Sequence, residues 1–483
     1  MTANRRQQSA PNDRELRLWK VGRALTLSFV AAVLGAGGVF FSLVVLLDFQ
    51  EIDKTAKLDA KTLFDLVKLS FGVVAGAGAL VALVVAYRRQ RVDEAGAHRE
   101  ATRLHTERFS QAVDKLGSDS PAVRLGGVHA LAGLADDAPD DSLRQTCVDV
   151  LCAYLQLPFT PDPGDDPTVE EEHHHYLAFR KVRHTILRLI GDHYRRPRGT
   201  HRSWQGCDLD LTGVTVDGSM NFGGAVFSGA SVDFSGARFS GAIVDFGGAT
   251  FSGASVDFSG ATFGSASVDF RSAAFSGAIV HFRGARFSGA TVDFGDAAFS
   301  GGTVDFRGAA FSGATVDFGD AAFSGGTVHF DLTVFSTGCT VDFRSAVFSS
   351  GTVHFRSAAF VGALVHFRSA AFSGGTVDLS ARFSGGTVDF SSAAFSGGTV
   401  HFRDAAFSRG AVGFGSAVFS GGTVDLGAAF SGRTVDFSRA RFSGGTVDFR
   451  AARGPVPTGL LASVGTPVPP TVLLAPAWLP TSP

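Results

Sequence analysis

The chain has few cysteines, few polar aromatic residues and no strong excess of charge of either sign. Its 483 residues include 4 Cys, 4 Tyr, 3 Trp and 2 Met, and the formal net charge at pH 7 is -2. The cysteines form no C-x-x-C pair, which excludes the usual spacing of a zinc ribbon or a thioredoxin-like redox site. A net charge near zero also excludes a polyelectrolyte built to neutralise long stretches of nucleic acid.

No group of residues has the spacing of a catalytic or metal centre. Three consecutive histidines, His173 to His175, come nearest. Consecutive residues on a helix point about 100° apart, so these rings cannot converge on one ion. We therefore expect no metal, no cofactor, no small-molecule substrate and no catalytic residues, which means that the protein is not an enzyme.

Phenylalanine, by contrast, is abundant, with 46 residues. Over residues 227–449 the pattern F-S-G-[AG]-x-V-[DH]-F-x-x-A-x recurs with a period of 12. Residues two apart share one face of a strand, so each A-x-F and V-x-F group predicts a short strand with its apolar residues inward. Intervening Gly and Ser predict turns. A short fixed period of this kind predicts a β-solenoid with phenylalanine in its interior.

The length of one coil follows from how many phenylalanines must fit inside it. We favour a four-sided coil of two repeats, because two sheets close enough for a one-repeat coil leave little room for two rings. The four-sided coil stacks Phe299 on Phe275 and Phe323, whereas the thinner alternative stacks it on Phe287 and Phe311. The one-residue insertion and the two deletions in the repeat fall in predicted turns, where they leave the strand faces unchanged.

The outward position between Val and Phe forms a polar ladder on two of the four sides. It is Asp in most repeats and His in five, and we expect its members, such as Asp305 and Asp317, to be exposed. Two interpretations stay open: a solvated polar surface, with Arg after Phe relieving the repulsion between stacked Asp, or a partner-binding surface. The candidate interaction ladder comprises Asp293, Asp305, Asp317, His329, His354, His366 and His401.

Two uncharged runs, 24–47 and 69–87, reach the roughly 20 residues that a helix needs to cross a bilayer. A cleaved signal peptide is the alternative for the first run, but its apolar core is too long and a second run follows at once. Basic residues before the first run and after the second place both ends in the cytoplasm. We therefore expect a multi-pass protein of a bacterial inner membrane, with two spans, cytoplasmic termini, a cytoplasmic solenoid and free thiols.

The remaining segments are assigned from composition and periodicity. A stripe of apolar residues predicts helices within 92–157. A helix beginning near 169 has one apolar face and one basic face, the latter with Arg180, Lys181, Arg183 and Arg188. The expected organisation is a basic N-terminus (1–23), a transmembrane hairpin (24–91), a helical module (92–157), a Pro/Asp linker (158–168), an amphipathic basic helix and connection (169–203), a solenoid N-terminal cap (204–226), the β-solenoid (227–449) and a Pro-rich disordered tail that caps nothing (450–483).

The A-x-F-S-G step at 237–241 resembles the repeat of the pentapeptide-repeat family. The stretches R-F-S-Q-A-V-D-K-L-G-S-D (108–119) and V-R-L-G-G (123–127) resemble a helical module that joins membrane spans to such repeats in bacterial proteins. The resemblance implies a mainly β fold: a right-handed, four-sided β-helix behind two transmembrane helices and a small α-helical module.

This organisation predicts a membrane-anchored, non-catalytic binding or scaffolding surface for an unknown protein partner. The alternative is a DNA-mimicking modulator of a topoisomerase such as DNA gyrase, because some members of the family protect gyrase in this way. Residues 207–453 hold 20 Asp, no Glu and 16 Arg, a field too weak for a full duplex mimic. Direct binding of nucleic acid is not expected. A homo-oligomer would form through the transmembrane helices or through the uncapped solenoid end.

Overall fold

The computed structural model of the protein describes residues 26, 30, 33, 34, 37, 38, 60–159, 162–164, 168, 170–241, 243–431 and 434–479. The chain divides into two compact units, Met1–Arg103 and Leu104–Pro483. The long helix α2 (Ala60–Leu116) belongs to the first unit up to residue 103 and to the second beyond it.

The expected transmembrane helices are not supported. Among the described residues, no helix combines the length and the apolar character needed to cross a membrane. The prediction of two spans is therefore wrong, and so is the multi-pass inner-membrane location built on it. The run 69–87 is an internal part of α2, and nine of its 19 residues are Gly, Ala or Ser, which add little apolar surface per turn. The run 24–47 lies almost entirely outside the described residues.

Three helices pack together before the solenoid: α3 (Pro121–Asp136), α4 (Asp141–Gln156) and α5 (Glu170–Tyr194). We use the name helical module for these three from here on, because α5, expected as a separate amphipathic helix, shares their core. Proline occupies the first turn of α3, where its missing N–H costs nothing. At the start of α4, the side chain of Asp140 accepts a hydrogen bond from the Leu143 backbone N–H at 2.8 Å. The core of the module consists of fully buried aliphatic residues from all three helices: Val128, Leu131, Val148, Leu151, Val182, Ile186 and Ile190.

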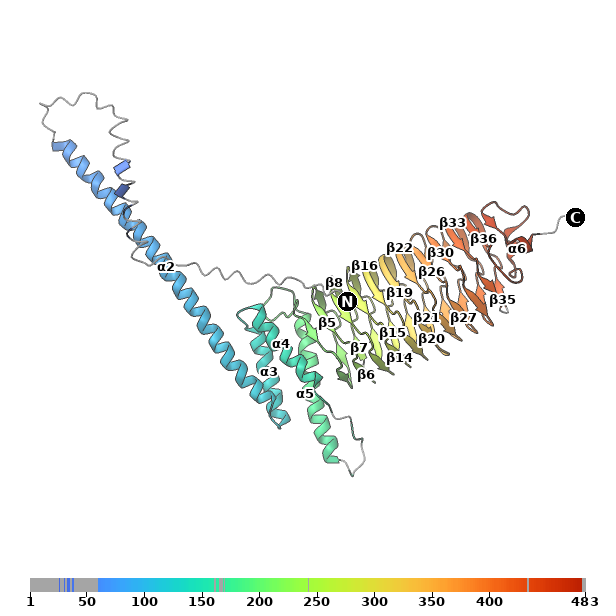
Figure 1. Ribbon diagram of the computed structural model, residues 1–483, viewed down its shortest axis with the longest axis horizontal. Coiled ribbons are helices and arrows are strands. Elements are labelled where there is room, and N and C mark those ends of the chain that lie inside the picture. Colours follow the sequence, from blue (N-terminus) through green and yellow to red (C-terminus); the bar gives the residue numbers. More distant parts are fainter. Residues whose placement is uncertain are drawn as a thin grey trace, which may run out of the picture. The chain divides into compact units, whose positions relative to one another are not determined.

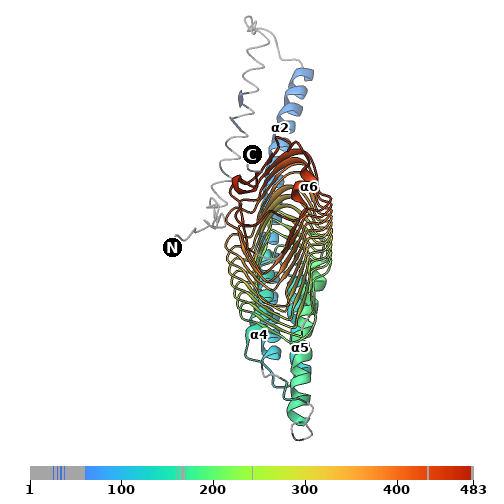
Figure 2. The same cartoon turned by 90° about the vertical axis from the view of Figure 1, so that its right-hand side faces the viewer.

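The β-solenoid follows as about eleven right-handed coils with strictly parallel pairing between neighbouring coils (Figure 1). Viewed from the end, the coils lie one over another around a common interior (Figure 2). Phe299 pairs with Phe275 and Phe323, and its ring stacks on theirs at 4.9 and 4.8 Å. The prediction of a two-repeat coil is thus confirmed, and the thinner coil is wrong.

Three sheets make up the four sides. The first sheet covers two sides, which merge into single long strands in some coils. It contains β1 (Leu209–Asp210), β4 (Val226–Ser228), β5 (Ser231–Asp233), β8 (Thr250–Ser252), β9 (Ser255–Asp257), β12 (Ala274–Ser276), β13 (Ile279–His281), β16 (Ala298–Asp305), β19 (Ala322–His329), β22 (Val347–His354), β25 (Ala371–Phe372), β26 (Thr376–Asp378), β29 (Ala394–Phe395), β30 (Thr399–His401), β33 (Val418–Asp425), β36 (Arg441–Asp448) and β37 (Val472–Leu473).

The second and third sheets cover one side each. The second contains β2 (Thr215–Val216), β6 (Arg238–Ser240), β10 (Thr262–Gly264), β14 (Arg286–Ser288), β17 (Ala310–Ser312), β20 (Val334–Phe335), β23 (Ala359–Val361), β27 (Arg382–Ser384), β31 (Ala406–Ser408) and β34 (Ala429–Phe430). The third contains β3 (Met220–Asn221), β7 (Ile243–Asp245), β11 (Ser267–Asp269), β15 (Thr291–Asp293), β18 (Thr315–Asp317), β21 (Thr340–Asp342), β24 (Leu364–His366), β28 (Thr387–Asp389), β32 (Ala411–Gly413) and β35 (Thr434–Asp436).

The interior holds four columns of stacked rings, and the predicted core residues Phe299, Phe311 and Phe323 are buried. The two deletions in the repeat coincide with leucine in place of phenylalanine, at Leu379 and Leu426. At both positions the turn is one residue shorter. The backbone N–H of Ala381 donates to the Leu379 carbonyl and that of Ala428 to the Leu426 carbonyl, each at 2.7 Å, whereas in the other turns the donor is the N–H three residues after the phenylalanine. The deletions therefore lie in turns, as predicted.

Both ends of the solenoid are covered (Figure 1). At the first coil, the ring of Tyr194 at the end of α5 lies 5.1 Å from that of Phe227. At the last coil, residues 450–479 were expected to be a disordered tail, and this expectation is wrong. They form α6 (Leu460–Val464), β37 and a 3-10 helix η2 (Pro476–Trp478). Buried Leu460 and Trp478 cover the core there, so the expected uncapped end for oligomerisation is absent from this part of the chain.

Candidate functional site

The candidate ladder residues lie on two different sides of the solenoid. Asp305, His329, His354 and His401 lie on the first sheet, whereas Asp293, Asp317 and His366 lie on the third. We call the first column the A wall; it comprises Asp233, Asp257, His281, Asp305, His329, His354, Asp378, His401, Asp425 and Asp448. We call the second the C wall; it comprises Asp245, Asp269, Asp293, Asp317, Asp342, His366, Asp389, Gly413 and Asp436.

Every aspartate of the two walls accepts a hydrogen bond from the backbone of its own turn. The Oδ1 atom of Asp305 accepts a hydrogen bond from the backbone N–H of Arg307 at 3.0 Å, and that of Asp293 accepts one from Gly295 at 2.8 Å. The same bond to the residue two positions later occurs at all thirteen wall aspartates. This bond explains why the repeat uses Asp, whose short side chain fits such a turn.

Asp305 is fully buried, so the expectation that it is exposed is wrong. Arg283 from the coil below covers it, with its Nε atom 2.5 Å from Oδ2, and Arg307 covers it with Nη2 at 2.6 Å. Burial alone would raise the pKa of Asp305. The His281 ring, 3.8 Å away, and the two guanidinium groups outweigh burial and hold the pKa well below its ordinary value. The arginine side chains themselves remain about half exposed, at 50% and 43%.

The same arrangement recurs along the A wall. Arg356 donates to Asp378 at 2.6 Å, and Arg403 lies 3.1 Å from Asp425. In each case the carboxylate is largely covered while the guanidinium faces outward. The residues that this surface presents are therefore the arginines, which sequence reasoning treated only as relief for stacked Asp. The signal for them was the position after Phe: Arg283, Arg307, Arg356, Arg403 and Arg450.

The C wall is different because five aspartates follow one another in successive coils, from Asp245 to Asp342. Asp293 has only Arg271 nearby, at 3.5 Å, and that guanidinium is already bonded to Asp269 at 2.6 Å. Burial and the neighbouring carboxylates of Asp317 and Asp269 raise the pKa of Asp293. Asp293 is thus under repulsion from its neighbours on the C wall, whereas Asp269 and Asp342 are each bonded to an arginine, Arg271 and Arg344, at 2.6 Å.

The histidines of the A wall are partly buried. The rings of His329 and His354 stack at 5.1 Å, and Nδ1 of His329 lies 3.3 Å from the Asp331 carboxylate. Burial lowers the pKa of His354. Nδ1 of His354 and Nδ1 of His281 are the buried side-chain polar atoms of the described residues that have no hydrogen-bond partner.

The described residues contain no group of three or more His, Cys, Asp or Glu side chains that could hold a metal ion. The three consecutive histidines of α5 diverge, as the helix geometry requires. His173 bonds to Asp162 at 2.8 Å, whereas the His175 ring packs on Phe179 at 4.4 Å. The four cysteines are free and buried, and burial raises the pKa of Cys147 and Cys152 to about 12.

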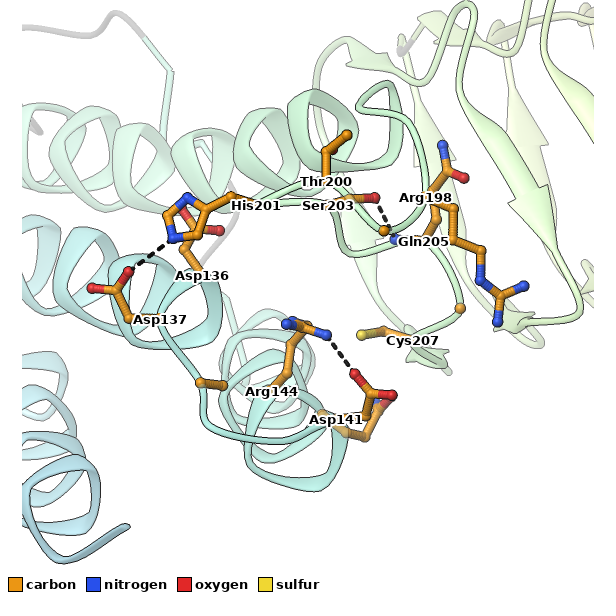
Figure 3. A pocket seen from close by; sticks show the side chains of 14 residues that line it. Asp136, Asp137, Asp141, Arg144, Arg198, Thr200, His201, Ser203, Gln205 and Cys207 are labelled. Carbon is orange, nitrogen blue, oxygen red and sulfur yellow. Dashed lines mark hydrogen bonds and ion pairs between the residues drawn. The ribbon is translucent and has the colours of Figure 1, made fainter. Parts of the chain in front are cut away.

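A polar pocket of about 810 Å³ lies where α3 and α4 meet the segment after α5 (Figure 3). Its charged groups are largely paired with each other: Arg144 lies 2.6 Å from Asp141, and His201 lies 3.3 Å from Asp137. Cys207 faces the pocket, but burial raises the pKa of its thiol to about 11, so it is protonated at neutral pH. The Cys207 thiol is therefore not activated as a nucleophile.

Comparison with known proteins supports the repeat assignment. Residues 211–261 match the family described as Pentapeptide repeats (9 copies). This match covers the first coils of the solenoid. Among solved structures, full-length QnrB1, a plasmid-mediated fluoroquinolone resistance protein, is 14% identical with a TM-score of 0.17, covering 55% of this chain and 94% of its own. A second, trypsin-treated structure of a QnrB1 variant has 14% identity, a TM-score of 0.12 and coverages of 55% and 90%. No curated protein matches the chain.

Proposed function

We propose that the pentapeptide-repeat solenoid is a non-catalytic protein-binding or scaffolding surface, and that its A wall binds an acidic partner. The observation that carries this proposal is the row of outward arginines held by buried carboxylates. Arg307, for example, forms three hydrogen bonds to the two oxygens of Asp305. A guanidinium fixed in this way loses little conformational freedom when a partner carboxylate binds it.

The interior makes this row rigid. Phe306 follows Asp305 directly in sequence, and its ring stacks on Phe282 and Phe330 at 4.8 and 4.9 Å. Stacked parallel coils repeat at about 4.8 Å, so the outward groups keep a fixed spacing along the wall. Charges in a fixed register determine which partner fits and in which orientation more than they determine raw affinity.

The test is a quantitative capture experiment with the full chain as bait. The double variant Arg307→Gln/Arg356→Gln removes two A-wall guanidinium groups. The matched control, Arg286→Gln/Arg382→Gln, removes two arginines from the second sheet, at β14 and β27. Proteins that bind the native chain should be lost with the A-wall variant and retained with the control, and their binding should weaken steeply with salt. Equal retention, or equal loss, with both variants would refute the assignment to the A wall.

DNA mimicry directed at a topoisomerase is a second candidate, and the C wall is the observation that favours it. Its five successive aspartates form a one-sided acidic row, although a carboxylate every ~4.8 Å is sparser than the charge of duplex DNA, one per ~1.7 Å. Purified protein should then inhibit supercoiling by DNA gyrase, and Asp293→Asn/Asp317→Asn should reduce the inhibition. If the native chain does not inhibit supercoiling, this candidate function is excluded.

A further inference from the structure

Two of the chain's four tyrosines line one small cavity of the helical module. Tyr154 comes from α4 and Tyr176 from α5, and the cavity between them has a volume of about 220 Å³. Phe159 and Phe179 complete the aromatic lining, and the rings of Phe159 and Tyr176 lie 5.4 Å apart. Flat apolar walls of this kind suit a flat apolar ligand. The cavity is below the roughly 300 Å³ at which drug-sized ligands begin to fit, so the ligand must be small.

The charged groups of the cavity are all basic. Arg124 and Arg183 line it together with His175, and no carboxylate is among its lining residues. Arg183 was expected on the basic face of its helix, opposite the apolar face, but its side chain is turned inward and the residue is only 5% exposed. Its guanidinium donates one hydrogen bond, to the Thr215 carbonyl at 3.0 Å, and lies 4.6 Å from the centre of the Phe159 ring.

Neither arginine has an ion-pair partner in the part of the chain that the structure describes. Arg124 donates to the Ser118 carbonyl and, at 3.1 Å, to the hydroxyl of Tyr154, and it lies over the Phe179 ring at 4.5 Å. A buried guanidinium without a counter-ion is costly, and burial lowers the pKa of Arg183 accordingly.

The nearest candidate for a counter-ion is already occupied. The Asp217 carboxylate is close enough to offset part of the burial effect on Arg183. However, it accepts hydrogen bonds from Tyr176 at 2.5 Å and Arg180 at 3.2 Å, and it contacts His184 at 3.2 Å. Several N–H groups of Arg183 therefore remain available to an anion that enters the cavity.

We propose that this cavity binds a small aromatic monocarboxylate. Its carboxylate would accept hydrogen bonds from Arg183 and Arg124, whose planar guanidinium groups match carboxylate geometry. Its ring would pack against the tyrosine and phenylalanine side chains that line the cavity. This site lies in the helical module and is independent of the A wall, so neither proposal depends on the other.

The test is calorimetric titration of the full chain with benzoate, and with benzamide as the uncharged analogue of the same shape. We expect saturable binding of benzoate and binding of benzamide that is weaker by about tenfold or more, since hydrogen bonds to charged groups are the stronger ones. Absence of saturable benzoate binding, equal binding of both probes, or binding of inorganic phosphate but not benzoate would overturn the proposal.

Variants locate the site. Arg183→Gln and Arg124→Gln should each weaken benzoate binding by about tenfold, with circular dichroism confirming the native helix content. The Arg183→Gln variant also loses the hydrogen bond to the Thr215 carbonyl of the first coil, which could disturb folding. Arg124→Gln leaves that bond in place and therefore tests the cavity separately. The control is Arg188→Gln on α5, an exposed arginine paired with Asp192, which should bind benzoate like the native chain. Unchanged affinity in Arg124→Gln, or an equal loss in the control, would contradict the assignment.

Discussion

The A wall and the C wall are built from the same V-[DH]-F turn, yet the A wall carries five arginines after Phe and the C wall three, Arg271, Arg344 and Arg368. On the A wall, histidines interrupt the aspartates and arginines from the adjacent coil cover them, as Arg283 covers Asp305. On the C wall, Asp293 stands between Asp269 and Asp317, and its nearby arginine, Arg271, lies 3.5 Å away and is already bonded to Asp269. Because each coil contains two repeats, alternate repeats go to different walls, and small differences between them accumulate into two distinct surfaces.

The largest expected effect is one that the two walls should share. Phe306 lies beneath the A wall and Phe294 beneath the C wall, and both rings are fully buried. We expect Phe306→Ala and Phe294→Ala to lower the free energy of unfolding by about 3–5 kcal/mol each, because each leaves a ring-sized cavity in a stacked column. Urea denaturation followed by circular dichroism measures both. If the two variants lose very different amounts of free energy of unfolding, the walls differ in the core beneath them and not only at the surface.

The second effect separates the turns that lead into the two walls. Gly302 precedes the A-wall strand residues in β16, with φ +93°, and an added Cβ would lie 2.1 Å from the Ala278 carbonyl oxygen. Gly313 precedes the C-wall strand β18, with φ +58° and open space around it. We expect Gly302→Ala to cost about 3 kcal/mol or more, and Gly313→Ala about 1–2 kcal/mol, which is the cost of left-handed backbone alone. Thermal unfolding of the two variants measures both losses of stability. Similar losses would contradict the close contact between Gly302 and the Ala278 carbonyl of the neighbouring coil.

The smallest effect concerns the histidines, which the A wall has in greater number. Burial holds the pKa of His354 below its ordinary value, so the neutral ring is favoured in the folded state. Its contribution to stability is present above the ordinary pKa of about 6.5 and is lost as the pH falls from there through the folded pKa. We expect His354→Gln to lessen the loss of stability between pH 7.5 and pH 5.5. His366→Gln, on the C wall, serves as the comparison, and an identical response in both would deny His354 this role.

The period of the repeat was enough to predict the solenoid, its phenylalanine columns and the two-repeat coil. It could not predict the burial of Asp305, because the group that covers it, Arg283, is 22 residues away and belongs to another coil. The same limit applies to the cavity of the helical module. Arg183 belongs to a basic face by helical spacing, but its side chain is turned inward and donates to the Thr215 carbonyl of the first coil, 32 residues away.

The predictions from composition were wrong near both ends of the chain. The Pro-rich segment 450–479 has no repeat and was expected to be disordered, but a few apolar side chains such as Leu460 and Trp478 suffice to cover the last coil. The uncharged run 69–87 satisfied the length criterion for a span, but it is a section of a continuous 57-residue helix, and no described helix could cross a membrane.

The most direct test of the difference between the walls compares Asp305→Asn with Asp293→Asn at pH 7. Asparagine keeps the Oδ1 acceptor of the turn, removes the charge and puts an NH2 donor in place of the Oδ2 acceptor. Asp305→Asn should lower the free energy of unfolding by about 1.5–3 kcal/mol, because two guanidinium groups lose their carboxylate. Asp293→Asn should leave it unchanged or raise it by up to about 0.5 kcal/mol, because repulsion from Asp269 and Asp317 disappears. Equal losses in the two variants would contradict the account.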